Sequence, residues 1–179
     1  MYYELATMTL PFGTAGQAAP NVQAWASAAE AQGELLGCWF TDIGQLNQMI
    51  VLRGFSDLAA LQAERERGQR STSPFGCGEI YQSLEQHSYQ GFGWMKPVRP
   101  SSESGIAGPV YEIRTYGIKT GGVHPTIDLW PQYVPPPEKP SPCVVAMVAL
   151  DGPLRVTNIW AYPALAASGT GRADAVAQG

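Results

Sequence analysis

An internal repeat constrains the fold of this 179-residue chain more than any other feature of its sequence. The segment YELAT at residues 3–7 returns as YEIRT at residues 111–115, and Gly44 returns as Gly152 at the same spacing. Further apolar matches follow in the same order after a slip of one residue. Ordered matches at a nearly constant offset are typical of a duplicated structural unit with small deletions. We therefore expect two copies of one unit.

The first copy alternates between the patterns of strands and helices. Runs rich in aromatic and β-branched residues end at turn residues such as Pro11 and Gly13, and other segments carry apolar residues at helical spacing. The predicted helices are residues 22–36 and a segment from a cap at Ser56 to Arg70, and the predicted strands are residues 3–10, 36–41, 48–53 and 79–89. The order β-α-β-β-α-β is the ferredoxin-like pattern, which places both helices on one sheet face and leaves the other face in need of cover.

The second copy is predicted to be degenerate. Its segment at residues 127–133 runs into three consecutive prolines, which exclude a helix there. Residues 164–178 are predicted to form a helix, with nothing after it to supply a fourth strand. The predicted strands of this copy are residues 110–116, 144–150 and 156–162. The expected domains are a first ferredoxin-like repeat at residues 1–90, a Pro- and Ser-rich linker at 91–109, and a shortened second repeat at 110–179.

Composition and charge exclude several classes of partner. The chain has 11 Lys and Arg residues and a formal net charge of -4, which argues against nucleic acid and offers no polybasic patch to a membrane. No apolar run approaches the ~20 residues of a membrane helix, and residues 1–4 do not resemble the start of a signal peptide. We expect a cytoplasmic protein. Only 15% of the residues are charged, a low share that suggests that a partner covers part of the surface.

The cysteines and histidines limit the chemistry further. Three widely spaced cysteines suggest neither a disulfide framework nor a metal site, so no metal and no cofactor are predicted. The sequence contains no phosphate-binding glycine motif and no nucleophile elbow. Of the two histidines, His124 lies in the loop GGVHP, a usual place for functional side chains. A plain surface residue is the alternative reading of His124.

Two carboxylates occupy matching places in the repeats. Glu4 and Glu112 each lie between apolar neighbours on a predicted strand, where burial would raise the carboxyl pKa and suit a general base. The alternative is that these side chains face solvent or meet Arg53 or Arg114 across the sheet. The candidate catalytic residues are therefore His124, Glu112 and Tyr116.

Aromatic residues are many for a chain of this length. They are candidates for the lining of a cavity that binds an apolar ligand, although packing in the core explains such residues equally well. The candidate pocket residues are Tyr3, Trp25, Trp39, Tyr111, Trp130 and Trp160.

The chain resembles the NIPSNAP family. The resemblance rests on the opening Tyr-Glu-Leu or Tyr-Glu-Ile of each copy, on GQLNQ at residues 44–48, on residues 154–162 and on the two-copy layout. It implies a dimeric α+β barrel arrangement, in which two ferredoxin-like sheets pack into a barrel, and a homodimer or higher homo-oligomer. It implies no agreed reaction. The sequence departs from the family at its C-terminal end and at the shortened segment near Trp130.

The function expected from these observations is a small-molecule-binding or assembly module of the NIPSNAP type. The alternative is a cofactor-free monooxygenase or isomerase of the dimeric α+β barrel type, acting on an apolar or aromatic small molecule with His124, Glu112 or Tyr116 as base. A weaker variant is haem handling, in which the loop histidine would be an axial ligand.

Overall fold

The computed structural model describes residues 1–99, 108–132, 134 and 143–166, which fall into two compact units. Unit 1 comprises Met1–Tyr89 and unit 2 comprises Gln90–Gly179. In the described residues no helix is long and apolar enough to cross a membrane.

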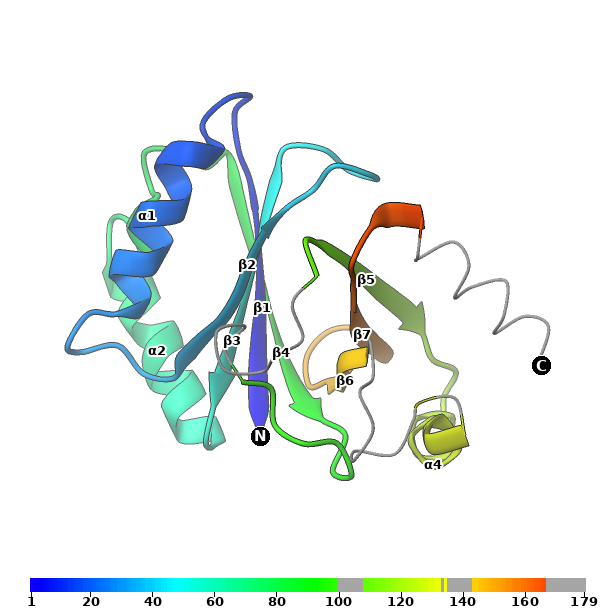
Figure 1. Cartoon of the computed structure of the whole chain (residues 1–179). Helices are drawn as coiled ribbons and strands as arrows, with labels where there is room; N and C mark the ends of the chain where they lie inside the picture. The colour runs from blue at the N-terminus through cyan, green and yellow to red at the C-terminus, as the bar shows by residue number, and fades with distance from the viewer. Residues whose placement is uncertain (100–107, 133, 135–142, 167–179) are drawn as a thin grey trace. The chain divides into compact units, whose positions relative to one another are not determined.

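Unit 1 is a four-stranded antiparallel sheet with two helices on one face (Figure 1). The strand order is β2-β3-β1-β4, and β3 pairs with β1 on one side and with β2 on the other. The elements are β1 (Tyr2–Thr9), α1 (Ala15–Ala26), β2 (Glu34–Phe40), β3 (Gln48–Phe55), α2 (Leu58–Arg70), the 3-10 turn η1 (Pro74–Gly76) and β4 (Ser83–Gly91). This is the expected ferredoxin-like order.

The core of unit 1 lies between the sheet and its helices. Alternate residues of β1, among them Ala6 and Met8, face Ala18 and Val22 of α1 and are fully or almost fully buried. Burial of each larger side chain, such as Met8 or Val22, contributes about 1.5–3 kcal/mol to the free energy of folding. This apolar layer fixes the helices over one face of the sheet.

The first helix begins earlier and ends earlier than residues 22–36, the range predicted from the sequence. The sequence pattern suggests that Pro20 precedes the helix, yet α1 begins at Ala15 and contains Pro20 in its interior. Proline removes one helical hydrogen bond, from its own position to the carbonyl of Gly16. Both residues are exposed, so water can satisfy that carbonyl.

The cap of α2 also differs from the prediction by one residue. Asp57, rather than Ser56, is the N-cap, and its Oδ1 accepts a hydrogen bond of 2.8 Å from the amide of Ala60. Ser56 instead donates to Oδ2 of Asp57. An N-cap side chain must reach the amide two or three residues ahead, a distance that suits Asp57.

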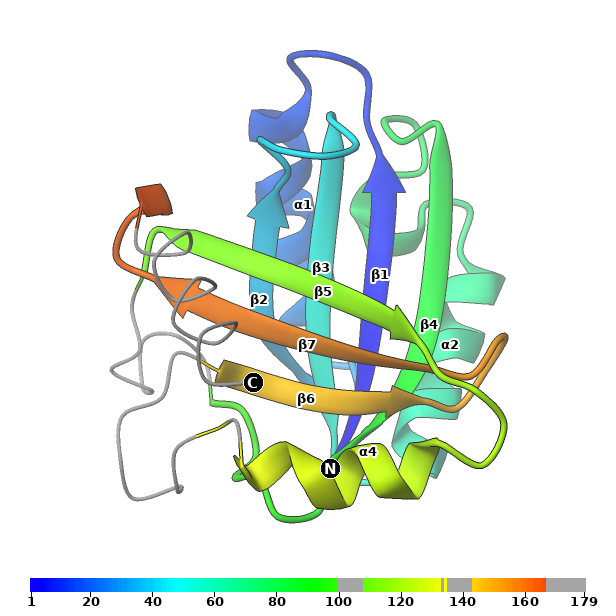
Figure 2. The same ribbon diagram turned by 90° about the vertical axis from the view of Figure 1, so that its right-hand side faces the viewer.

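Unit 2 contains a three-stranded antiparallel sheet in the order β6-β7-β5, visible in Figure 2 together with α4. Phe92, Ala146 and Val156 form its apolar cluster, and Ile127 and Trp130 pack against them. The face of the sheet that carries Ala146 and Val156 is therefore the helix side of unit 2. Its elements are β5 (Val110–Gly117), α4 (Val123–Leu129), the 3-10 turn η2 (Trp130–Gln132), β6 (Cys143–Ala149) and β7 (Arg155–Tyr162).

The helix α4 corrects the expectation that this part of the second copy has none. The prediction relied on the prolines that follow, but the helix ends before them, at Leu129. Pro125 lies in its first turn, where backbone amides have no intrahelical partner and proline is tolerated. Of the other predicted segments, the linker residues 100–107 and most of the helix at 164–178 lie outside the described residues.

The strand registers of the two units match. Tyr2 is the Cα partner of Phe55 in the β1–β3 pair, and Val110 is the Cα partner of Tyr162 in the β5–β7 pair. These four positions are the ones that the sequence repeat relates to one another, including its slip of one residue. The duplication therefore extends to the pairing of the strands.

Candidate functional site

Glu4 and Glu112 occupy the same place in their units. Glu4 is the Cα partner of Arg53 in unit 1, and Glu112 is the Cα partner of Trp160 in unit 2. Strand alternation puts Glu4 on the side of Ala6 and Met8, which the helices of unit 1 cover. By the same alternation, Glu112 shares the helix side of unit 2 with Trp160 and Val156.

The carboxylate of Glu4 is enclosed. Its side chain is 1% exposed, and its Oε2 accepts hydrogen bonds from Nε of Arg65 at 2.8 Å and from Nε2 of Gln86 at 3.1 Å. Its Oε1 is buried without a donor in the described part of the chain. Burial raises the pKa of the Glu4 carboxyl, and the Arg65 guanidinium only partly opposes this rise.

A buried ionic network lies next to Glu4 and is centred on Glu64 of α2. Glu64 accepts hydrogen bonds from Arg53, from Arg67 at 2.6 and 3.0 Å, and from the amide of Gln32 at 3.0 Å. Burial acts to raise the pKa of this carboxyl, but the hydrogen bonds from Arg67 and Arg53 outweigh burial and leave the pKa below its usual value. The network joins the sheet to α2.

Trp25 belongs to this network. Its indole Nε1 donates to Oε1 of Glu64 at 3.1 Å, and the guanidinium of Arg67 lies 3.6 Å from the centre of its ring. Trp25 also contacts Phe75, with ring centres 6.2 Å apart. Through these contacts, the side chain of Trp25 links α1 to α2.

The matching site of unit 2 is more open. Arg114 donates through Nη2 to Oε2 of Glu112 at 2.8 Å and to the hydroxyl of Tyr162 at 3.3 Å. Its guanidinium lies 5.1 Å from the centre of the Trp160 ring. The side chains of Arg114 and Glu112 are 23% and 16% exposed. An ion pair among aromatic rings is thus accessible to solvent.

Beside this ion pair lies a fully buried amide. Asn158 is the Cα partner of Arg114 across the β5–β7 pair and is 0% exposed. Its Oδ1 accepts a hydrogen bond of 2.5 Å from Nε1 of Trp160. Its Nδ2 has no acceptor in the described residues. A buried donor without an acceptor costs about 1–3 kcal/mol, so such groups need an explanation.

A second buried donor lies nearby. Nε1 of Trp130 is buried, and the group it meets in the described part of the chain is the thiol of Cys143, a weak acceptor. Trp130 packs against the cluster that contains Ala146, and Ala146 is the Cα partner of Asn158 across the β6–β7 pair. The helix side of unit 2 therefore brings together the guanidinium of Arg114, the unpaired amide of Asn158 and the indole of Trp130, an arrangement suited to an acceptor oxygen.

Cys143 adjoins the same site but is unsuited to nucleophilic chemistry. It is the Cα partner of Trp160, and burial raises the pKa of its thiol to about 12, although Arg114 and Trp130 act in the opposite direction. A thiol with such a pKa is protonated at neutral pH.

The structure places the predicted catalytic residues as follows. Glu112 lies in the site of unit 2, and Tyr116 lies further along β5 with 47% of its side chain exposed. His124 is the second residue of α4 and is exposed. The described residues contain no group of three His, Cys, Asp or Glu side chains that could hold a metal ion.

The six aromatic residues proposed as a pocket are divided between the units. Trp130 and Trp160 lie on the helix side of unit 2, and Tyr111 lies on β5 with its side chain on the opposite face. Trp25 belongs to the network of unit 1, while Tyr3 and Trp39 lie on β1 and β2. The sequence analysis missed Asn158. The signal for it was a side-chain amide in the middle of β7, directly before the apolar residues 159–161.

Solved structures of similar proteins define the class of fold. An anthrone oxidase-like protein matches over 98% of this chain and 83% of its own, with a TM-score of 0.63 at 14% identity. A candidate monooxygenase from Lactobacillus acidophilus matches over 95% and 80%, with a TM-score of 0.63 at 9% identity. The fold is that of the α+β barrel proteins built from ferredoxin-like units.

Within this class, the sequence identifies the family. The profile of the NIPSNAP family matches residues 3–74 and 111–179, so the chain belongs to the NIPSNAP family. A NIPSNAP family protein from Agrobacterium tumefaciens is 21% identical over 55% of this chain and 98% of its own, with a TM-score of 0.43. Among curated proteins, none matches the chain.

Proposed function

We propose that the protein binds a small aromatic or apolar molecule that carries an acceptor oxygen, on the helix side of unit 2. The observation that carries this proposal is the buried donor Nδ2 of Asn158, which has no acceptor in the described residues and lies across the β5–β7 pair from Arg114. A ligand oxygen would satisfy a group that otherwise costs free energy in the folded state.

The charge and the rings define the ligand further. The guanidinium of Arg114 favours a carboxylate, an enolate or a phenolate oxygen, because hydrogen bonds to such groups are charge-assisted. The indole rings of Trp160 and Trp130 offer apolar area for the body of the molecule. Pockets of this kind combine aromatic walls with a few well-placed polar groups.

The protein is further proposed to act as a homodimer or higher homo-oligomer in the cytoplasm. The barrel class of the fold, in which ferredoxin-like sheets pack face to face, supports this part of the proposal. Free thiols on all three cysteines suit a reducing compartment. A native mass equal to the 19.2 kDa of one chain at micromolar concentration would contradict the assembly.

The binding proposal is tested with the purified full chain. Native mass spectrometry followed by denaturing extraction should detect a discrete small molecule on the wild-type protein. Arg114→Met should retain at least tenfold less of it, whereas Lys119→Ala, which removes an exposed cation of the same unit, should retain the wild-type amount. Equal retention by Arg114→Met, or an empty wild-type protein that binds no aromatic acid, would count against the site.

A second candidate function is an isomerase or cofactor-free monooxygenase step. It is favoured by the position of Glu112 on the same face as the donors, because a carboxylate can take a proton from carbon while the donors stabilise the resulting enolate oxygen. The C–H bond breaks, its proton moves to Glu112, and its electron pair delocalises onto the carbonyl oxygen.

This second candidate has its own test. The name of the anthrone oxidase-like structure suggests anthrone as the first probe. Exchange of its methylene protons for deuterium should be faster with the wild-type protein than with Glu112→Gln. If both proteins give the uncatalysed exchange rate, the chain is a binding protein for this class of molecule at most.

A further inference from the structure

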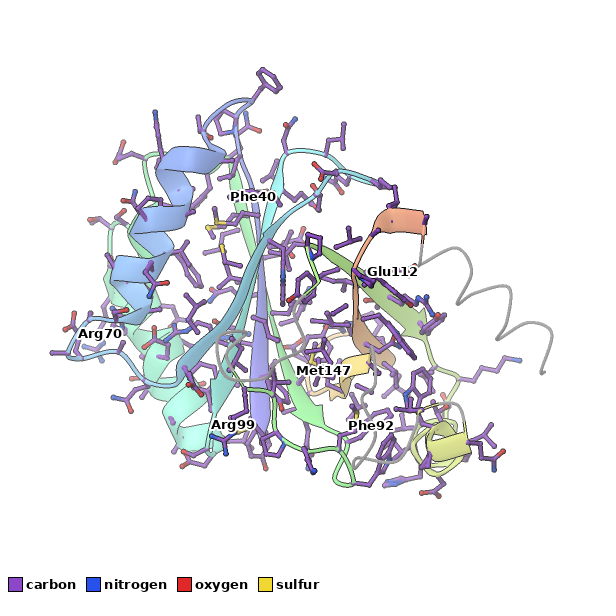
Figure 3. All side chains as sticks on the ribbon, viewed as in Figure 1. Phe40, Arg70, Phe92, Arg99, Glu112 and Met147 are labelled. Carbon is purple, nitrogen blue, oxygen red and sulfur yellow. The ribbon has the colours of Figure 1, made fainter. Side chains whose placement is uncertain are left out.

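Four large apolar side chains are exposed on two neighbouring loops of unit 1. Phe12 is 92% exposed at the turn between β1 and α1, and Ile43 and Leu46 are 71% and 56% exposed in the β2–β3 loop. Phe40, at the end of β2, is 44% exposed and is labelled in Figure 3. We call residues 10–14 and 40–47 the apolar loops. Exposed apolar side chains on two adjoining loops are candidates for an interaction site.

The two apolar loops lie at the same end of the unit 1 sheet (Figure 1) and are bonded to each other. The amide of Leu10 donates to the carbonyl of Asn47 at 2.8 Å. Thr14 closes the first loop with a hydrogen bond of 2.8 Å to the carbonyl of Pro11. In the second loop, the amide of Gln48 donates to the hydroxyl of Thr41 at 3.1 Å. These bonds hold the loops in a fixed shape.

The turns of both loops require special backbone conformations. Gly13 and Gly44 have φ angles of 81° and 92°, and Asn47 has a φ of 59°. Glycine adopts such values without strain. The apolar side chains are therefore presented by defined turns, with several of the loop amides and carbonyls already paired. Pairing of the backbone lowers the cost of moving a segment out of water.

We propose that the apolar loops insert into the interface of a zwitterionic lipid bilayer. Specific protein interfaces bury about 800 Å² on each partner, from roughly 20–30 residues. Four side chains at the tips of two loops fall short of that area. A bilayer needs no complementary shape, since apolar groups settle about 5–10 Å into the boundary between headgroups and acyl chains.

Charge selects the kind of lipid. Asp42 is the one charged residue within residues 10–14 and 40–47, and the whole chain carries a net charge of -4. Anionic lipids repel such a surface, so the attraction comes from the apolar side chains alone. This inference departs from the sequence-based expectation of no membrane contact, which rested on the missing basic patch and the missing membrane helix.

The inference is tested by flotation of the full chain with phosphatidylcholine vesicles. The wild-type protein should float with the vesicles, and adding phosphatidylserine should not raise the bound fraction. The double variant Phe12→Ser with Ile43→Ser should bind at least tenfold less. Leu58→Ser is the matched control, because Leu58 is an apolar residue of the same unit, on α2, with 49% of its side chain exposed.

Both variants are expected to melt at the wild-type temperature, since the replaced side chains are exposed. A wild-type protein that does not float overturns the inference. So does a double variant that floats as well as the control. If the double variant instead changes the native mass of the assembly, the loops contact another copy of the chain and the lipid inference is wrong. Ligand retention at Arg114 is independent of all three results.

Discussion

Glu4 and Glu112 are equivalent in the two copies, yet Glu4 is 1% exposed and Glu112 is 16% exposed. Arg65, from α2, hydrogen-bonds the first carboxylate, whereas Arg114, two residues away on the same strand, hydrogen-bonds the second. The same position is therefore enclosed in unit 1 and remains accessible in unit 2. After a duplication, equivalent positions can thus have a structural role in one copy and a binding role in the other.

The stability of the protein should depend on pH through Glu4. The folded-state pKa of this carboxyl is raised, chiefly by burial, so the folded chain holds the proton more tightly than the unfolded chain. Its contribution to stability is therefore largest below the ordinary pKa of about 4.5 and falls as the pH rises through the raised value. Glu4→Gln stays neutral, so its stability relative to wild type should increase across that pH range. Urea unfolding at several pH values measures the difference, and a constant difference would contradict the prediction.

Removal of Glu64 should be far more costly. Glu64→Ala leaves the guanidinium of Arg53 buried without its carboxylate, and breaking a buried pair in this way typically costs about 3–5 kcal/mol. Glu66→Ala, on the same helix but 50% exposed, should change the free energy of unfolding by less than about 1 kcal/mol. Equal effects of the two variants in urea titrations would show that the network adds nothing to stability.

The thiols should react slowly in the folded protein. Burial, with a smaller contribution from neighbouring Cys77, raises the pKa of Cys38 to about 11, from an ordinary value of 9.0. At pH 8 the thiolate fraction should then be about 100-fold lower than in an unfolded chain. Labelling with an aromatic disulfide should proceed at least that much faster in denaturant than in buffer. Rapid labelling of Cys38 in the folded protein would contradict the burial of this side chain.

The repeat made the strands predictable, while two prolines misled the prediction of helices. The matches around Gly44 and Gly152 correctly located both hairpins, because a hairpin register follows from its turn and its flanking apolar residues. Proline was read as a helix boundary, but Pro20 lies on an exposed face and Pro125 lies in a first turn. The effect of a proline depends on where the lost hydrogen bond falls, which the sequence alone does not reveal.

The candidate site was only half predictable. Glu112 stood out because it matches Glu4, whereas Asn158 lies in a strand whose apolar residues do not alternate with polar ones. Without alternation, the sequence gives no indication of which face an amide occupies. The pairing of this amide is a property of the packed structure. Its Oδ1 accepts a hydrogen bond from Trp160, whereas its Nδ2 has no acceptor in the described residues.

Replacing the amide of Asn158 with a carboxylate should abolish ligand binding while preserving the fold. Asn158→Asp keeps the acceptor for Nε1 of Trp160 and replaces the unpaired donor with a second acceptor oxygen. A ligand that presents an acceptor oxygen would then meet repulsion, so retention should fall at least tenfold. Asn158→Leu removes both functions, leaves Nε1 of Trp160 unpaired and should lower the free energy of unfolding by about 1–3 kcal/mol. Retention by extraction and stability in urea are measured on both variants. Undiminished retention by Asn158→Asp, with wild-type secondary structure, would mean that the ligand does not use this donor.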